Sequence, residues 1–159
     1  MVLAPLLPLL AALLPAQAAP GQAGAVGVGV TERFGAHAAS RSHLMAWLRP
    51  ADPLFFGVGL GHATTRDTVA GVSIRASAAF DHELVDLQAF RILIEGGGVA
   101  TFGAADSQLV STVGPAARLV FLSGDDPISV SLGWSPEFQP GTHPSFEGAA
   151  SELSFRAWF

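Results

Sequence analysis

The chain has 159 residues, which leaves room for one domain once a short export segment is removed. Hydrophobic residues make up 50% of the sequence, charged residues only 13%, and the mean hydropathy is +0.44, so the chain is too apolar for an ordinary water-soluble surface. The eight basic residues are scattered arginines and the net charge is -5, which excludes the clustered basic surface that nucleic acid requires. The lack of cysteine excludes disulfides and thiolate metal sites, and no motif indicates a cofactor.

The amino terminus carries an export pattern. An apolar run from Val2 to Leu14, which contains two prolines, is followed by Ala16-Gln17-Ala18, a small-x-small cleavage pattern. The run is shorter than the ~20 residues that a transmembrane helix needs, and the prolines disfavour one continuous helix. We therefore predict a signal peptide at residues 1–18 and a mature domain at residues 19–159.

After Ala18 the sequence alternates between large apolar residues and small or polar ones. The clearest case lies in the third predicted strand, where Leu54, Phe56, Val58 and Leu60 alternate with glycines. Helical spacing cannot produce this two-residue period, which is typical of β-strands with two different faces. In chain order, strands are predicted at residues 26–30, 44–48, 54–60, 69–80, 85–95, 117–121, 128–134 and 153–159.

Eight strands place both chain ends at the same end of an antiparallel up-and-down β-barrel. Short connections rich in Pro, Asp and Gly are expected at that end, at residues 49–53, 81–84 and 123–127. The opposite end would carry the connections at residues 35–42, 64–67, 96–110 and 139–148. The strand at 85–95 has the poorest pattern because its apolar parity changes near Ala89, and a β-bulge or a misplaced boundary could account for this.

The bulky face of such a barrel can point outward to lipid or inward to a ligand. Aromatic residues near both ends favour the outward arrangement, because membrane barrels carry aromatic belts at the two interfaces. Near the short connections lie Trp47, Phe55, Phe56, Phe80, Phe121, Trp158 and Phe159, and near the other end lie Trp134 and Phe138. We take Trp47, Phe56, Phe80, Phe121 and Trp134 as the aromatic girdle. The prediction is a transmembrane β-barrel in outer-membrane lipid, and a soluble periplasmic barrel that binds a lipid inside is the alternative.

The lumen of an eight-stranded barrel is narrow enough for side chains to fill it. By alternation, Arg75, Arg118 and Arg156 point inward together with Glu152, and Glu95 is a further candidate. Opposite charges would offset the cost of burying each other, so a lumenal charge network that ties strands together is expected, and a selective channel is the less favoured alternative. The glycines between Gly57 and Gly61 relieve crowding on the inner wall.

The last strand resembles the closing strand of outer-membrane barrels, which ends in an aromatic residue preceded by alternating apolar positions. The matching residues here are Leu153, Phe155, Ala157 and Phe159. The resemblance implies recognition by the barrel assembly machinery. Residues 128–138, with Ser135-Pro136-Glu137 leaving a strand, resemble the penultimate hairpin of the YfaZ family, a resemblance confined to the last third of the chain.

An enzymatic alternative rests on His143-Pro144-Ser145, which resembles the His-x-Ser of outer-membrane lipid A deacylases. In that family the histidine activates the serine and an acid orients the histidine, a role that Glu147 or Glu152 would have to take. Here the tripeptide lies in a predicted loop, whereas in the family it lies on a lipid-facing strand. The sequence therefore favours a non-enzymatic barrel with a structural or loop-binding role and an unidentified ligand. A metal site formed by His37, His43 and His62 is weighed against isolated histidines, which the spacing favours.

Overall fold

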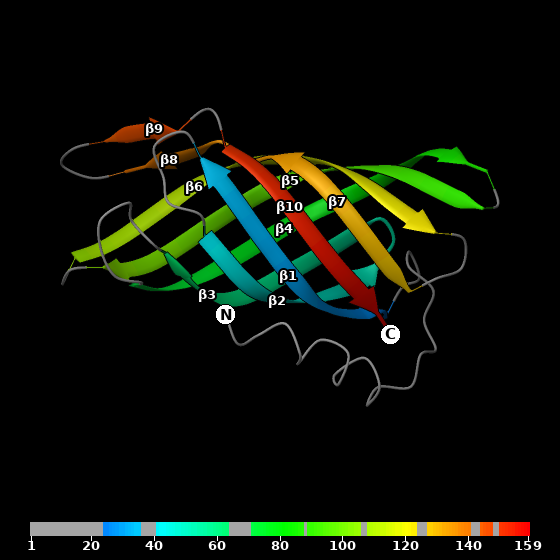
Figure 1. Cartoon of the computed structure of the whole chain (residues 1–159), viewed down its shortest axis with the longest axis horizontal. Coiled ribbons are helices and arrows are strands. Elements are labelled where there is room, and N and C mark those ends of the chain that lie inside the picture. The colour runs from blue at the N-terminus through cyan, green and yellow to red at the C-terminus, as the bar shows by residue number, and fades with distance from the viewer. Residues whose placement is uncertain are drawn as a thin grey trace.

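The chain folds into a closed antiparallel β-barrel of eight strands (Figure 1). The computed structural model describes residues 24–35, 41–63, 71–87, 89–105, 108–123, 127–140, 144–147 and 150–159. Within these ranges no helix is long and apolar enough to cross a membrane. The predicted signal peptide and its cleavage point lie outside the described residues, so they stay predictions.

The barrel is built from ten strand segments. Segments β1 to β7 pair in chain order, each with the next. Segment β7 then pairs with β10, and β10 closes the ring on β1. The segments are β1 (Val26–Gly35), β2 (Arg41–Ala51), β3 (Leu54–Ala63), β4 (Gly71–Asp86), β5 (Phe90–Ala105), β6 (Gln108–Ser123), β7 (Ile128–Trp134), β8 (Glu137–Gln139), β9 (Ser145–Glu147) and β10 (Ala150–Trp158).

Segment β8 continues the line of β7 beyond a short interruption. Pro136 has no backbone N–H and cannot continue the hydrogen-bond ladder, yet two residues later Phe138 pairs with Val113 of β6. Segment β9 pairs with β8 and leads back towards β10. The predicted number of strands, eight, is therefore correct for the closed ring.

The boundaries around the fourth and fifth strands differ from the prediction. The turn expected at residues 81–84 is wrong, because β4 continues to Asp86 and the turn lies just beyond it, where the Leu87 N–H donates to the Phe90 carbonyl over 3.1 Å. A register shift between Glu83 and Val85 changes the parity within β4, and the sequence pattern could not distinguish this shift from a turn. The parity change near Ala89 is the turn itself.

The long loop expected at residues 96–110 is also wrong. Segment β5 runs through it to Ala105, and β6 begins at Gln108. Three consecutive glycines interrupt the alternation of bulky residues by which a strand is recognised in the sequence. Gly96, Gly97 and Gly98 nevertheless each have a partner on β4. Segments β4, β5 and β6 are the longest strands, and the hairpin of β4 and β5 reaches beyond the other turns at the right of Figure 1.

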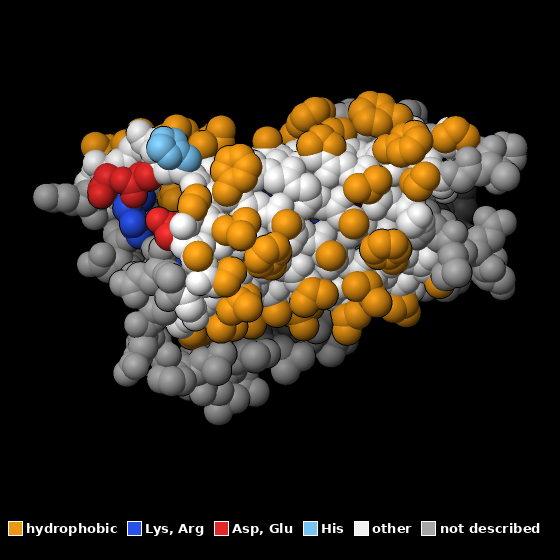
Figure 2. Space-filling view, turned by 180° about the vertical axis from the view of Figure 1, so that it is seen from behind, with side chains coloured by type: hydrophobic (Ala, Val, Ile, Leu, Met, Phe, Trp, Pro, Cys, Tyr) orange, Lys and Arg blue, Asp and Glu red, His pale blue; other side chains and the backbone are white. Residues whose placement is uncertain are grey.

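The bulky apolar side chains point away from the barrel axis. Val58, Leu60, Val72 and Leu132 are 57%, 63%, 70% and 56% exposed, while their strand neighbours Gly57, Ser73 and Ser131 are buried. Figure 2 shows hydrophobic side chains across the barrel wall, with charged ones gathered at one end. This polarity contradicts the alternative of a soluble barrel with bulky side chains around an internal lipid.

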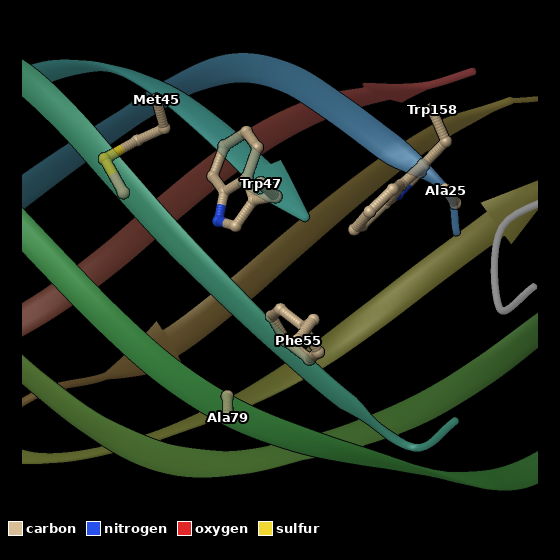
Figure 3. Close-up of a cluster of buried hydrophobic side chains, with 6 residues drawn as sticks. All are labelled: Ala25, Met45, Trp47, Phe55, Ala79 and Trp158. Carbon is tan, nitrogen blue, oxygen red and sulfur yellow. The ribbon is translucent and has the colours of Figure 1, made fainter. Parts of the chain in front are cut away.

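The larger of two buried apolar clusters in the described part of the barrel lies close to the end that holds the C-terminus. Trp47, Phe55 and Trp158 gather there with small neighbours, and the rings of Phe55 and Trp158 meet edge to face with centroids 6.4 Å apart (Figure 3). The placement of Trp47 in the girdle is therefore wrong, because this side chain is only 4% exposed. Its position along the strand suits a belt, but its alternation with outward Leu48 turns it inward.

Candidate functional site

Alternation along the strands places a set of charged side chains inside the barrel. Each of these side chains points into the lumen, and none is more than 7% exposed. We call this set the lumenal network; it consists of Arg33 (β1), Arg75 (β4), Glu95 (β5), Arg118 (β6), Glu137 (β8), and Glu152 and Arg156 (β10).

The half of the network near the loop end is organised around Glu137. Its Oε1 lies 2.8 Å from Arg75 Nη1 and 3.3 Å from Arg33 Nε, and its other oxygen accepts a hydrogen bond from the Thr112 hydroxyl. Arg75 also donates to Thr101 Oγ1 over 3.1 Å. Through the lumen, these contacts join four strands (β1, β4, β5 and β6) to β8 or to each other, in addition to the backbone pairing of β4 with β5 and of β6 with β8.

The other half continues through Glu152 and Glu95. Glu152 lies between two arginines, 2.7 Å from Arg75 Nη2 and 2.7 Å from Arg118 Nη2. Arg118 Nη1 lies 3.5 Å from Glu95, whose two oxygens face the guanidinium of Arg156. Acids and bases therefore alternate from Arg33 to Arg156, so each buried charge has an opposite charge beside it.

Aromatic faces extend the network to the end that holds the C-terminus. The guanidinium of Arg156 lies 5.0 Å from the ring centre of Trp47, and that of Arg49 lies 5.3 Å from Phe55 and 5.7 Å from Trp158. Such stacking favours a cation in a desolvated site. Arg49 also pairs with Asp81, with Nη1 3.0 Å from Oδ1, so this mouth of the lumen is closed by an ion pair.

Little free volume remains between these groups. A cavity beside Arg49, Glu95 and Arg156 measures about 20 Å³, which suits about one water molecule. A second hollow, among Trp47, Arg118 and Glu152, has no room for a water molecule. Around these two hollows the lumen is filled by its own side chains.

The structure brings together all four residues predicted for the lumenal charge network, Arg75, Arg118, Glu152 and Arg156, and also Glu95. Sequence reasoning missed Arg33, Arg49, Asp81 and Glu137. Arg33 shares the parity of Gly27 and Gly29, so a longer first strand would have placed it inside. Glu137 and Asp81 lie beyond the ends of the predicted strands, so alternation assigned neither of them to the lumen.

Glycines on β3 make room for the bulky inward side chains of β2. A Cβ at Gly57 would lie 2.6 Å from Trp47 Cδ1 and 2.7 Å from its Nε1. A Cβ at Gly59 would meet the Met45 sulfur, and one at Gly61 would meet the His43 ring. As predicted, these glycines relieve crowding on the inner wall, because they leave space beside the bulky inward side chains of the neighbouring strand.

The other girdle residues face outward. Phe56, Phe80 and Phe121 are exposed towards the end with the short turns, and Trp134 is exposed at the end of β7. Phe55 and Trp158, which lie near the same turns, are buried inside with Trp47. Exposed phenylalanines that the sequence reasoning did not use lie towards the loop end, at Phe34, Phe102 and Phe146, beside the predicted Phe138.

Three of the four predicted assembly residues lie on β10, and the fourth, Phe159, follows it directly. Phe155 is exposed, and Leu153, Ala157 and Phe159 are half-buried, all on the outward parity of a strand that pairs with β1 on one side and β7 on the other. Their strand is therefore the one that closes the ring. Whether the assembly machinery recognises them stays a prediction.

The enzymatic and metal hypotheses fall largely outside the described residues. His143 and the side chains of Ser145 and Glu147 lie outside them, while Glu152, the other acid considered, is inside the barrel between two arginines. His37 is likewise outside the described ranges. His43 is buried in the lumen with its Nε2 2.9 Å from Ser73 Oγ, and His62 is exposed on the opposite face, so these two histidines do not share a site.

Comparison with solved structures gives the same architecture. The N-terminal β-barrel domain of Pseudomonas aeruginosa OprF aligns with 86% of this chain and 98% of its own, with a TM-score of 0.60 and 15% identity. Neisserial surface protein A (TM-score 0.47, 10% identity, 84% and 93% covered) and Ail of Yersinia pestis (0.36, 10%, 87% and 100%) are further matches. No family model matches the chain, and no curated protein matches its sequence. The fold is therefore that of small eight-stranded outer-membrane barrels, and the YfaZ resemblance stays a hypothesis.

Proposed function

We propose that the chain is a non-enzymatic integral barrel of the outer membrane, which stabilises the membrane or presents its loops to a partner. The observation that carries this proposal is the reversed polarity of the molecule, with bulky apolar side chains outside and paired charges inside. Lipid is the environment in which this arrangement is favourable, because water would leave the apolar wall exposed. Outer-membrane lipid is the first partner that the surface implies.

A filled lumen supports a structural role over transport. Opening a path would require separating ion pairs such as Arg75 to Glu152 and Arg118 to Glu152, whose oxygens and nitrogens are 2.7 Å apart. Removing one partner of a buried pair leaves an uncompensated charge, which is strongly unfavourable. The proposed barrel therefore carries no steady ion current.

Export and insertion complete the proposal. Residues 1–18 would direct the chain across the inner membrane as a cleaved signal peptide. The closing strand β10, through Leu153, Phe155, Ala157 and Phe159, would then be recognised by the barrel assembly machinery.

Membrane fractionation combined with gel migration tests this proposal. The expressed chain should pellet with outer membranes and should migrate faster without heating than after boiling, because a membrane barrel resists detergent. Labels at Val72 and Leu132 should report acyl chains, and the purified barrel should give no steady conductance in a planar bilayer. Recovery in the soluble periplasmic fraction, or a dry protein environment at both labels, would overturn the proposal.

A further inference from the structure

A short β-hairpin overlaps the segment that the sequence places in an outer loop, residues 139–148. Segments β8 and β9 pair antiparallel, with Phe138 opposite Phe146 and Gln139 opposite Ser145. On its other side, β8 pairs with β6 through Val113 and Phe138. Figure 1 shows this hairpin at the left, at the barrel end opposite the C-terminus.

The two faces of the hairpin have opposite character. Residues directly paired across antiparallel strands share a face, so Val113, Phe138 and Phe146 form one row. They are 50%, 43% and 68% exposed. We call Phe138 and Phe146 the aromatic pair.

The opposite face is fixed from inside the barrel. Glu137 precedes Phe138 and is only 3% exposed, with Arg75 and Arg33 at 2.8 Å and 3.3 Å from its Oε1 and the Thr112 hydroxyl on its other oxygen. These contacts hold the base of β8 against the lumen. Since successive residues of a strand point to opposite faces, they also fix the outward direction of Phe138.

The aromatic pair is continuous with the lipid-facing wall. Val113 belongs to the outward apolar surface of β6, together with Leu119 and Phe121 further along the same strand. The described residues next to the hairpin ends, Pro140 and Pro144, are exposed and uncharged. A row that starts on the barrel wall and ends in two uncharged rings matches acyl chains better than water.

We propose that the aromatic pair docks onto the acyl chains of the leaflet surrounding the loop end, and that Glu137 holds it there from the lumen. The hairpin is then a membrane-contacting arm and not a loop presented to the solution. This inference rests on the proposed integral membrane function. In this inference the aromatic pair contacts lipid. In a loop-binding role the same surface would contact a protein partner.

Single-cysteine variants test the proposal directly, because the chain contains no cysteine. Phe138→Cys and Phe146→Cys carry a nitroxide label in phosphatidylcholine vesicles, and collision with oxygen is compared with collision with a water-soluble nickel chelate. Val72→Cys is the lipid reference, and Glu83→Cys, from an exposed ion pair at the other barrel end, is the aqueous reference. Labels at both phenylalanine positions should follow Val72→Cys, with high oxygen and low nickel accessibility.

The outcomes separate this inference from the proposed function. A nickel-accessible label at both phenylalanine positions, with the Val72→Cys label still in lipid, overturns the aromatic arm alone. An aqueous label at Val72→Cys as well overturns the integral membrane proposal. Spin–spin broadening at Phe146→Cys would show that a second copy covers the pair, and it would overturn lipid as the occupant.

A second variant tests the role of Glu137. Glu137→Gln keeps the size of the side chain but removes its charge, and it should raise nickel accessibility at the Phe146→Cys label while the Val72→Cys label is unchanged. Glu83→Gln, which removes a carboxylate from the opposite end, is the matched control and should move neither label. An unchanged Phe146→Cys label in folded Glu137→Gln protein would overturn the anchoring by Glu137.

Discussion

Single glycines decide which side chains the lumen can hold. Gly57 lies beside the Trp47 ring, so the tryptophan occupies space that a Cβ on β3 would need. A residue without a side chain on one strand thus permits the largest residue on the next. The same relation holds between Gly133 of β7 and Arg118 of β6, whose Cγ lies 2.5 Å from where a Cβ would be.

Gly57→Ala should therefore destabilise the barrel. The added methyl would overlap the Trp47 ring, and overpacking of this kind costs about 1–3 kcal/mol. Urea unfolding in detergent, followed by tryptophan fluorescence, measures the loss. Gly98→Ala is the matched control, because its Cβ would meet only a backbone oxygen at 3.7 Å, and an equal loss for both variants would contradict the packing argument.

Removing a lumenal carboxylate should lower the stability of the barrel far more than removing an exposed one. Glu152→Gln leaves Arg75 and Arg118 buried with one fewer opposite charge, so we expect a loss of about 3–5 kcal/mol of stability. Glu83→Gln breaks a 3.7 Å pair with Arg91 at the surface, where the expected loss is under about 1 kcal/mol. Denaturation midpoints in the same detergent compare the two variants, and similar losses would show that the lumenal pairs contribute no more than a surface pair.

At the scale of the strand, the element that closes the ring is also the one with a predicted assembly role. Segment β10 pairs over most of its length with both β1 and β7, so the barrel has no free edge there. A strand with two partners must be added correctly for the barrel to close.

Deleting Phe159 should reduce the amount of folded protein in outer membranes without changing expression. The measurement is the fraction of heat-shiftable barrel after fractionation, with Phe102→Ala as a control that removes an exposed aromatic from β5, a strand that does not pair with β10. Undiminished folding after the deletion would make the assembly prediction wrong.

At the scale of the whole molecule, the outward apolar wall spans the barrel from the short turns to the loop end. Exposed bulky residues occur on every strand of the ring, including Val26 on β1, Leu44 on β2 and Phe155 on β10. Such a surface is stable only where lipid replaces water around the full circumference.

Leu132→Arg should destabilise the barrel in lipid more than Ile128→Arg does. Leu132 lies inside the paired length of β7, whereas Ile128 is its first residue, near the short turns. A cationic side chain costs about 2–4 kcal/mol at the bilayer midplane and about 0–1 kcal/mol near the interface. Unfolding of the two variants in phospholipid vesicles tests this, and equal effects would contradict the assigned depth.

Two-residue alternation was enough to predict the barrel, its eight strands and four of its inward charges. Arg75, Arg118, Glu152 and Arg156 all lie on the inward face of their strands, and their bulky apolar neighbours lie on the outward face. The same rule places Trp47 inside the barrel, because Trp47 alternates with the outward residue Leu48. The girdle prediction instead relied on the closeness of Trp47 to the end of its strand. Alternation is a local property, so the sequence by itself determined it.

Only the tertiary structure decided which strands run on and which charges meet. The glycines in the middle of β5 carry no bulky pattern, and a register shift in β4 reverses parity, so pairing with neighbours had to define those boundaries. The link from Arg33 through Glu137 to Arg75 joins β1, β8 and β4, residues far apart in the chain. Such contacts depend on closing the ring, because closure brings strands that are distant in sequence around one narrow lumen.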